Sequence, residues 1–262
     1  MKISVVIRTK NQEKALDFLL KNLKQRYAED IDEVVVLDNL SVDNSRKVAE
    51  RYDARFVSIE KFSYGGSANI GASSVLNEIV VIFSAHSYPV SPDFFKVIKQ
   101  KFEENPDLAG LRCLHSTNDY KNYIVGIDAV TDPNKSGLIF SGSAFKRETW
   151  KTIPFNEDVP TFEDKDWTRR VLKAGYQIDF APVVFNYEIK RTPAQDYFRF
   201  TRDVLGNYQI WHQEHSGLSI IKGFIMSLIR IFKQSFIQTY YALKRLFFMI
   251  RFKFNKPQKF DY

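Results

Sequence analysis

The sequence has 262 residues, of which 44% are hydrophobic and 15% aromatic, which excludes a disordered chain and allows a large buried core. The single cysteine, Cys113, excludes an internal disulfide framework and fits a reducing compartment. The formal net charge of +7 arises at the C-terminal end, because residues 217–262 contain nine Lys and Arg and one acidic residue. The N-terminus, MKISVVIRTKN, lacks the apolar stretch and cleavage site of a signal peptide, so we expect a cytoplasmic protein.

The first half of the chain alternates apolar, β-branched runs with helical patterns. Buried strands that alternate with helices indicate an α/β fold with a mostly parallel sheet covered on both faces. No Pro- or Gly-rich linker divides residues 1–216, which we expect to form one domain. Strands are predicted at residues 3–9, 32–39, 54–60 and 78–84, and helices at residues 11–27, 41–52 and 64–77.

Polar side chains follow these predicted strands. In parallel sheets, ligands bind outside the carboxyl ends of the strands, so the residues after each strand are the place to look for a site. Together they predict a site suited to a nucleotide or a sugar. The segments concerned are residues 8–11, 38–39, 62–69 and 84–89.

The segment PTFEDKDWTRRVLKAGY, residues 160–176, predicts a helix with Glu163, Asp164 and Asp166 in its first turn. Acidic residues there complement the helix dipole, which is a sufficient structural reason for them. The dipole does not explain the aromatic Phe162 and Trp167. A carboxylate at a helix N-terminus on the rim of a pocket can also act as a general base on an incoming hydroxyl.

Six segments in this order resemble the family 2 glycosyltransferases, which have the GT-A fold. They are SVVIRTKN, VVVLDNLSVDNS, YGGSANIGA, FSAHSYP, FSGSAFKRETW and FEDKDWTRRVLKAGY. The resemblance covers roughly residues 1–190 and is closest to the rhamnosyltransferase-like members that build bacterial surface polysaccharides. It implies an inverting transferase that moves a sugar from a nucleotide-diphosphate donor to a glycan or lipid-linked acceptor.

The resemblance also implies roles for individual residues on the donor side. Asp38 matches the acid that binds the nucleotide base, and Thr9 and Asn11 lie on a loop that meets the same nucleotide. Asn69 matches the turn and helix that flank the diphosphate and ribose. Ser84 stands where the fourth strand reaches the nucleotide sugar.

On the acceptor side, the resemblance makes Asp164 the general base for inverting transfer. Glu163 would contact the acceptor, and Trp167 would form an aromatic wall for the acceptor sugar.

The sequence departs from the family at the Asp-x-Asp motif, whose last acid binds a divalent cation. Those positions read Ser84-Ala85-His86, so His86 replaces the metal-binding acid. Imidazole can hold Mn²⁺, whereas Mg²⁺ prefers oxygen ligands, so the cofactor is expected to be Mn²⁺ or Mg²⁺ bound at His86. The alternative is that His86 offsets phosphate charge directly, without a metal.

A second departure lies in VVFNYEIKR, which offers Asn186, Tyr187 or Glu188 where many members carry a further metal-binding His. Without a metal, the charge that develops on the leaving diphosphate must be met by other cations. The candidates are Arg8, Lys10, Arg147 and the arginines of YFRFTRD. The remaining histidines, His115, His212 and His215, have no spacing to one another that indicates a site, and Cys113 is expected to be buried.

Residues 217–262 predict a basic amphipathic helical extension. On a helix, Lys222, Arg230, Lys233, Lys244 and Arg251 fall within an arc of about 80°, and a broad apolar sector lies opposite. Charged residues interrupt every apolar stretch, so a spanning helix is not expected. The pattern favours contact with an anionic membrane surface, which would place the protein on the inner face of the cell membrane. The alternative is packing on the catalytic domain or on a second copy of the chain.

Two other functions remain open from the sequence. A catalytically silent nucleotide-sugar-binding homologue or scaffold would explain the missing Asp-x-Asp motif. A sugar nucleotidyltransferase shares the α/β plan, but the segment IRTKNQEKAL lacks the Gly-rich, basic signature expected after its first strand. No nucleic-acid partner is expected, because the apolar face of the tail is too large for a helix that only follows phosphates.

Overall fold

The computed structural model describes residues 1–188 and 191–260, and its contacts divide the chain into a unit of Met1–His212 and a unit that begins at Gln213. The strands are β1 (Ile3–Thr9), β2 (Glu33–Asp38), β3 (Arg55–Ser58), β4 (Ile79–Ser84), β5 (Ser87–Pro89), β6 (Leu108–Leu114), β7 (Ala144–Lys146) and β8 (Gln177–Tyr187). The helices are α1 (Glu13–Arg26), α2 (Ser45–Arg51), α3 (Tyr64–Ser74), α4 (Phe94–Glu104), α5 (Thr117–Ile124), α6 (Pro133–Ser136), α7 (Arg147–Thr152), α8 (Glu163–Lys173), α9 (Pro193–Trp211) and α10 (Gly217–Phe254).

The first unit is built on a mixed sheet with the strand order β3-β2-β1-β4-β7-β6-β8-β5. Strands β1 to β4 are parallel to one another, as the apolar runs of the sequence predict. β7 runs antiparallel to both of its neighbours, and β5 runs antiparallel to β8. The predicted α/β fold with a mostly parallel sheet is therefore confirmed.

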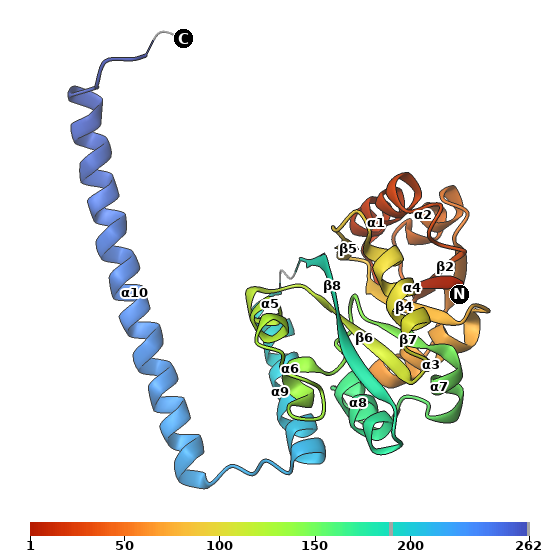
Figure 1. Cartoon of the computed structure of the whole chain (residues 1–262). Helices are drawn as coiled ribbons and strands as arrows, with labels where there is room; N and C mark the ends of the chain where they lie inside the picture. The colour runs from red at the N-terminus through yellow and green to blue at the C-terminus, as the bar shows by residue number, and fades with distance from the viewer. Residues whose placement is uncertain (189–190, 261–262) are drawn as a thin grey trace. The chain divides into compact units, whose positions relative to one another are not determined.

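Hydrophobic cores lie on both faces of the sheet because successive strand residues point to opposite sides. In β4, Ile79, Val81 and Phe83 join one core, whereas Val80 and Ile82 join the other. Helices α1, α2 and α4 supply the first core, and α3 and α8 supply the second. Figure 1 shows these helices around the strands of the first unit.

The parallel strands bring several polar residues to one edge of the sheet. The register pairs Thr9 with Asp38 across β1 and β2, and Arg8 with Ser84 across β1 and β4. Segments that are distant in the sequence thus end side by side. This edge is where an open α/β sheet binds its ligands.

The second unit consists mainly of the helix α10, which contains 38 residues and would be about 57 Å long at 1.5 Å per residue (Figure 1). Ser216 caps its N-terminus by accepting a hydrogen bond from the Ser219 N–H at 3.2 Å. None of its residues is buried, and all of its apolar side chains except that of Phe252 are exposed. Within residues 1–188 and 191–260, no helix combines the length and apolar character needed to span a bilayer.

Candidate active site

Thr9 and Asp38 form a polar pair with unsatisfied atoms at the carboxyl ends of β1 and β2. Asp38 is 3% exposed, and its Oδ2 accepts a hydrogen bond from the Ser41 N–H at 2.8 Å. Asp38 Oδ1 and Thr9 Oγ1 are buried without a hydrogen-bond partner among the described residues. Buried polar atoms are normally paired, so these two atoms are suited to the donors and acceptors of a ligand such as a base.

Asn11 joins the two loops that border this pair. Its side-chain oxygen accepts a hydrogen bond from the Val42 N–H at 2.8 Å, and its own N–H donates to Ser41 Oγ at 2.7 Å. Asn11 also adopts a left-handed backbone conformation with φ of 51°, which Asn tolerates better than most residues. Asn11 therefore ties the loop after β1 to the loop after β2.

Arg8 lies at the centre of this edge of the sheet. Its Nη1 is 3.3 Å from Ser67 Oγ and 3.5 Å from Glu163 Oε1, and its guanidinium lies 5.6 Å from the centre of the Phe140 ring. The side chain is 11% exposed. Arg8 thereby connects β1 with α3 and with the start of α8.

Glu163 and Asp164 open α8, with Asp166 also in its first turn, as the sequence predicts. Asp164 Oδ2 accepts a hydrogen bond from the Phe140 N–H, and Oδ1 accepts one from the Lys165 N–H, both at 2.8 Å. These two donors fix the orientation of the carboxylate. Asp164 is 8% exposed, so only a narrow part of it can meet a substrate.

The neighbouring Glu163 faces Arg8 and is 4% exposed, which corrects its expected role as an acceptor contact. Burial and the charge of Asp164 raise the pKa of Glu163 to about 7, although Arg8 opposes this shift. Close to neutral pH, this carboxyl group therefore exchanges between its neutral and charged forms. One pair of atoms joins Glu163 to Arg8, so the two side chains do not form a bidentate ion pair.

His86 follows β4 and is held by two neighbours. Its Nδ1 lies 2.9 Å from Gln12 Oε1, and its ring stacks on Tyr187 with centres 5.0 Å apart. Burial, followed by the charges of Arg191 and Arg8, lowers the pKa of His86, while Glu188 acts in the opposite direction. The surroundings of His86 are thus predominantly cationic.

The described residues do not fit a resident divalent cation at His86. Among residues 1–188 and 191–260, no group of three His, Cys, Asp or Glu side chains converges on one point. The Nδ1 atom of His86 already contacts Gln12. The acidic residue that influences the pKa of His86, Glu188, is exposed, and its effect is smaller than that of the two nearby arginines. Mn²⁺ and Mg²⁺ favour oxygen-rich sites, which this donor set does not provide.

Trp167 does not form the wall that we expect for an acceptor sugar. Its side chain is fully buried against Phe145 and Phe155, and its indole N–H donates to the Ile153 carbonyl at 2.6 Å. The prediction is wrong because this aromatic ring faces the inner side of α8. Trp167 belongs to the core that supports the start of the helix.

Asn69 is likewise a structural residue. Its side-chain oxygen accepts hydrogen bonds from the Trp150 indole and the Phe155 N–H, and its nitrogen donates to the Phe155 carbonyl and Glu157. These contacts use the whole amide, so the expected role beside the diphosphate is wrong. A surface hollow of about 480 Å³ lies beside Asn69, but it includes neither Asp38 nor Asp164.

Phe162 links α9 to the loop that precedes α8. Its ring stacks on Trp211 at the end of α9, with centres 6.1 Å apart. A Cβ added at Gly206 in α9 would lie 2.8 Å from carbon atoms of Phe162 and Thr161, so the close approach requires glycine. The aromatic residue that the helix dipole left unexplained therefore anchors the loop before Glu163.

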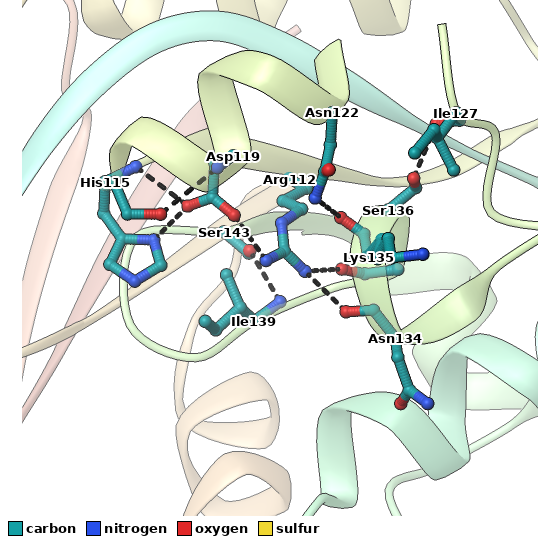
Figure 2. Close-up of polar contacts among 12 residues, drawn as sticks. Arg112, His115, Asp119, Asn122, Ile127, Asn134, Lys135, Ser136, Ile139 and Ser143 are labelled. Atoms are coloured by element: carbon teal, nitrogen blue, oxygen red, sulfur yellow. Dashed lines mark hydrogen bonds and ion pairs between the residues drawn. The ribbon is translucent and has the colours of Figure 1, made fainter. Parts of the chain in front are cut away.

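Sequence reasoning missed a buried polar network at the end of β6, drawn in Figure 2. Asp119 Oδ1 accepts a hydrogen bond from Arg112 Nη2 at 2.6 Å, and its other oxygen contacts the ring nitrogen Nδ1 of His115. His115 stacks on Phe185 and packs edge-on against Tyr187, the residue on which His86 also stacks. The signal in the sequence that could have indicated this network is the spacing of His115 and Asp119, which lie four positions apart.

Lys165 is a second buried charge that the sequence did not single out. Its Nζ donates to the Gly137 carbonyl at 3.0 Å, the same oxygen that Arg112 Nη1 contacts at 2.7 Å. Burial lowers the pKa of Lys165 to about 7, with the charge of Asp164 opposing the shift and that of Arg112 adding to it. The start of α8 and the β6 network are thus electrostatically connected.

Most of the other candidate cations already have partners within the protein. Arg147 donates to the Ala72 carbonyl at 3.1 Å and supports the end of α3. In α9, Arg199 pairs with Asp203 at 3.3 Å, and Arg202 lies over the Phe198 ring. Cys113 is buried, as expected, and burial raises the pKa of its thiol.

The model of the family described as Glycosyl transferase family 2 matches residues 4–171 of the sequence. The chain belongs to this family. Glu163 and Asp164 lie within the matched region, as do Arg8, Asp38 and His86. A search of curated protein sequences finds no match.

Solved structures of glycosyltransferases share the fold of this family member. The mannosyltransferase PcManGT from Pyrobaculum calidifontis, in complex with GDP-Man and Mn²⁺, matches with a TM-score of 0.64 and 21% identity over 83% of this chain and 66% of that one. Glucosyl-3-phosphoglycerate synthase from Mycobacterium tuberculosis, in complex with Mn²⁺ and UDP, matches with 0.60 and 18% identity over 82% of both chains. S. aureus TarS, in complex with UDP-GlcNAc, matches with 0.56 and 18% identity over 75% of this chain and 61% of that one.

These similarities establish the GT-A type of fold for this glycosyltransferase family member. The chain spans just under two thirds of the length of PcManGT and of the TarS chain. Structures with the same fold contain different nucleotides, and several contain Mn²⁺ or Mg²⁺.

Proposed function

We propose that the protein is an inverting glycosyltransferase that uses a nucleotide-diphosphate sugar. The observation that carries the proposal is that the segments of Asp38, Arg8 and Asp164 are joined at one edge of the sheet, by the strand register and by the contact of Arg8 with Glu163. Asp38 Oδ1 and Thr9 Oγ1, which have no partner among the described residues, would meet the nucleotide, and the family resemblance implies that Asp38 binds its base. Ser84 and Asn11 border the same region.

Asp164 is the proposed general base. It would remove the proton from the acceptor hydroxyl as that oxygen attacks the sugar carbon and the nucleoside diphosphate leaves, with inversion at that carbon. The N–H groups of Phe140 and Lys165 hold its carboxylate in place. A fixed orientation matters because the base must reach the hydroxyl proton within hydrogen-bonding distance.

We further propose that the acceptor is a glycan or lipid-linked precursor of a bacterial surface polysaccharide, as in the rhamnosyltransferase-like members of the family. Residues 217–262, which we treat as a tail separate from the catalytic domain of residues 1–216, would place the enzyme on the inner face of the cell membrane. α10 supports this because a basic stripe runs beside exposed aromatic and aliphatic side chains. Anionic lipid headgroups complement such a stripe.

The donor proposal is tested by thermal unfolding with a panel of UDP-, GDP- and dTDP-sugars, because a ligand of the folded state raises its stability by mass action. We expect one nucleotide class to raise the melting temperature of the wild type and to have little effect on Asp38→Asn. The matched control is Asp53→Asn, which changes a carboxylate that is 85% exposed and lies just before β3, away from the carboxyl ends of the strands. Equal stabilisation of wild type and Asp38→Asn would contradict the assigned base site.

A catalytically silent nucleotide-sugar-binding protein is the second candidate function. The observation that favours it is His86, which stands where the family's metal-binding acid would be and lies among cationic groups. Donor binding without transfer or hydrolysis, across a panel of acceptors, would support this candidate over the enzyme.

A further inference from the structure

We propose that Arg8, and not a resident divalent cation, neutralises the diphosphate of the donor in this protein. This inference rests on the proposed function, since it concerns how the same site holds its donor. It predicts that nucleoside diphosphates bind equally well with and without a divalent cation.

The first support is the position of Arg8. Its backbone lies directly beside Ser84 in the β1–β4 register, and its carbonyl accepts a hydrogen bond from the Ala85 N–H at 2.9 Å. These two residues and His86 occupy the three positions at which the family motif places its metal site. Arg8 therefore projects from the strand next to the altered motif.

The second support is the remaining hydrogen-bonding capacity of Arg8. A guanidinium carries five N–H donors, but among the described residues the side chain makes only two hydrogen bonds, both long, of 3.3 Å to Ser67 and 3.5 Å to Glu163. Both contacts use Nη1, which leaves Nη2 and Nε for a phosphate. Arginine is suited to this task because its planar fork matches phosphate oxygens and keeps its charge.

The third support is the charge around His86. Arg8 and Arg191 both act on the imidazole, and the opposing influence of Glu188 is smaller. The backbone of Glu188 is held at this point, because its N–H donates to the His86 carbonyl at 3.0 Å. A cationic environment repels Mn²⁺ and attracts a diphosphate, so Arg191 adds to the proposed role of Arg8.

In the protein without ligand, Glu163 pairs with Arg8 but uses only part of the hydrogen-bonding capacity of the guanidinium. The carboxyl group is buried against the guanidinium through one 3.5 Å contact. When a diphosphate arrives, Arg8 can turn toward the stronger anion, and Glu163 can become neutral by taking up a proton. Glu163 is therefore a positioning residue for Arg8.

The test is calorimetric titration of UDP, GDP and dTDP into the full-length protein, once with EDTA and once with Mn²⁺. We expect at least one nucleotide to bind the wild type with Kd values that agree within about twofold in the two buffers. In EDTA, Arg8→Gln should weaken this binding at least tenfold, and Arg8→Lys should recover part of the loss. Arg51→Gln, which removes an exposed arginine from α2, is the control and should bind like the wild type.

The variant His86→Asp adds a gain-of-function arm, because it restores an acid at the last position of the motif. We expect Mn²⁺ to tighten nucleotide binding by this variant at least tenfold, but not by the wild type. Tenfold tighter binding by the wild type in Mn²⁺, or unchanged binding by a folded Arg8→Gln, would overturn the inference and leave the proposed transferase standing. No binding of any nucleotide in either buffer would overturn both.

Discussion

Arg8 and Glu163 lie 155 positions apart in the sequence, yet Arg8 Nη1 is 3.5 Å from Glu163 Oε1 in a buried contact. This contact joins the end of the first strand to the start of the helix that carries Asp164. It places the proposed donor side and the proposed base side of the reaction next to each other.

The buried network around Asp119 should contribute strongly to stability. Asp119→Asn removes the charge that partners Arg112 and His115, and we expect a loss of about 3–5 kcal/mol in the free energy of unfolding, because a buried cation is left uncompensated. The control is Asp179→Asn, whose ion pair with Lys101 is half exposed and should contribute less than about 1 kcal/mol. Urea denaturation of both variants checks the difference, and similar losses for the two would contradict it.

The same network predicts how the stability of the protein changes with pH under acidic conditions. Burial opposes ionisation of Asp119, but the hydrogen bond with His115 and the charge of Arg112 outweigh it and hold the pKa of Asp119 below its usual value. Because the pKa of Asp119 is lower in the folded protein than in the unfolded chain, its ionised form stabilises the fold at pH values above about 4. This stabilisation is lost as the pH falls below that value. Wild type should therefore lose more stability than Asp119→Asn below about pH 4, as measured by thermal unfolding. Parallel profiles would contradict the assignment.

Glu163 should make stability fall as the pH rises from about 4.5 to 7. Its folded-state pKa of about 7 lies above its ordinary value of 4.5, so the folded protein binds more protons than the unfolded chain in this window. The unfolding free energy of the wild type should therefore fall by about 3 kcal/mol across this window, and Glu163→Gln should abolish this fall. Glu148→Gln, at an exposed position, is the control and should leave the slope unchanged. A wild-type slope retained in Glu163→Gln would contradict the prediction.

The basic stripe of α10 should control binding to anionic membranes. Reversing three charges of the helix should weaken co-sedimentation with vesicles that contain anionic lipid by about 100-fold, since each basic residue near such a surface contributes about 1 kcal/mol. Binding of the wild type should also fall with rising salt. The variant is Lys222→Glu with Arg230→Glu and Lys233→Glu, and the control reverses the exposed Lys14, Lys21 and Lys47 of the first unit.

Wild-type binding that is equal on neutral and anionic vesicles would contradict the membrane proposal. Self-association of the protein that depends on residues 217–254, without vesicle binding, would instead support packing of α10 against a second copy. Analytical ultracentrifugation at several concentrations distinguishes this outcome.

The fold was largely predictable because its signals are local and repeated. The apolar runs that became β1, β2 and β4 and the helical spacing of α1 are visible in single segments, and their order indicates a parallel sheet. The first turn of α8 was predictable for the same reason. The helix predicted at residues 41–52 begins only at Ser45, with Asn44 as its N-cap, because capping residues in a polar run are not distinguished by pattern alone.

The candidate site was predictable only in part, because side-chain direction and partners depend on the tertiary structure. Asp38 and Asp164 lie at the sheet edge that the strand exits indicated. Trp167 and Asn69 have the residue types expected of ligand contacts but are turned into the protein. The contact of Arg8 with Glu163 joins segments that share no local pattern, so no reading of either segment could have found it.

The most direct test of the central claim is the turnover of Asp164→Asn with the donor and acceptor of the wild type. We predict that kcat falls by about 10²–10⁴-fold while the donor Kd changes little, because the variant keeps the binding site and loses the base. Asp166→Asn, in the same helical turn and paired with Arg170 at 2.8 Å, is the matched control and should retain most of its activity. Turnover of a folded Asp164→Asn close to that of the wild type would contradict the account.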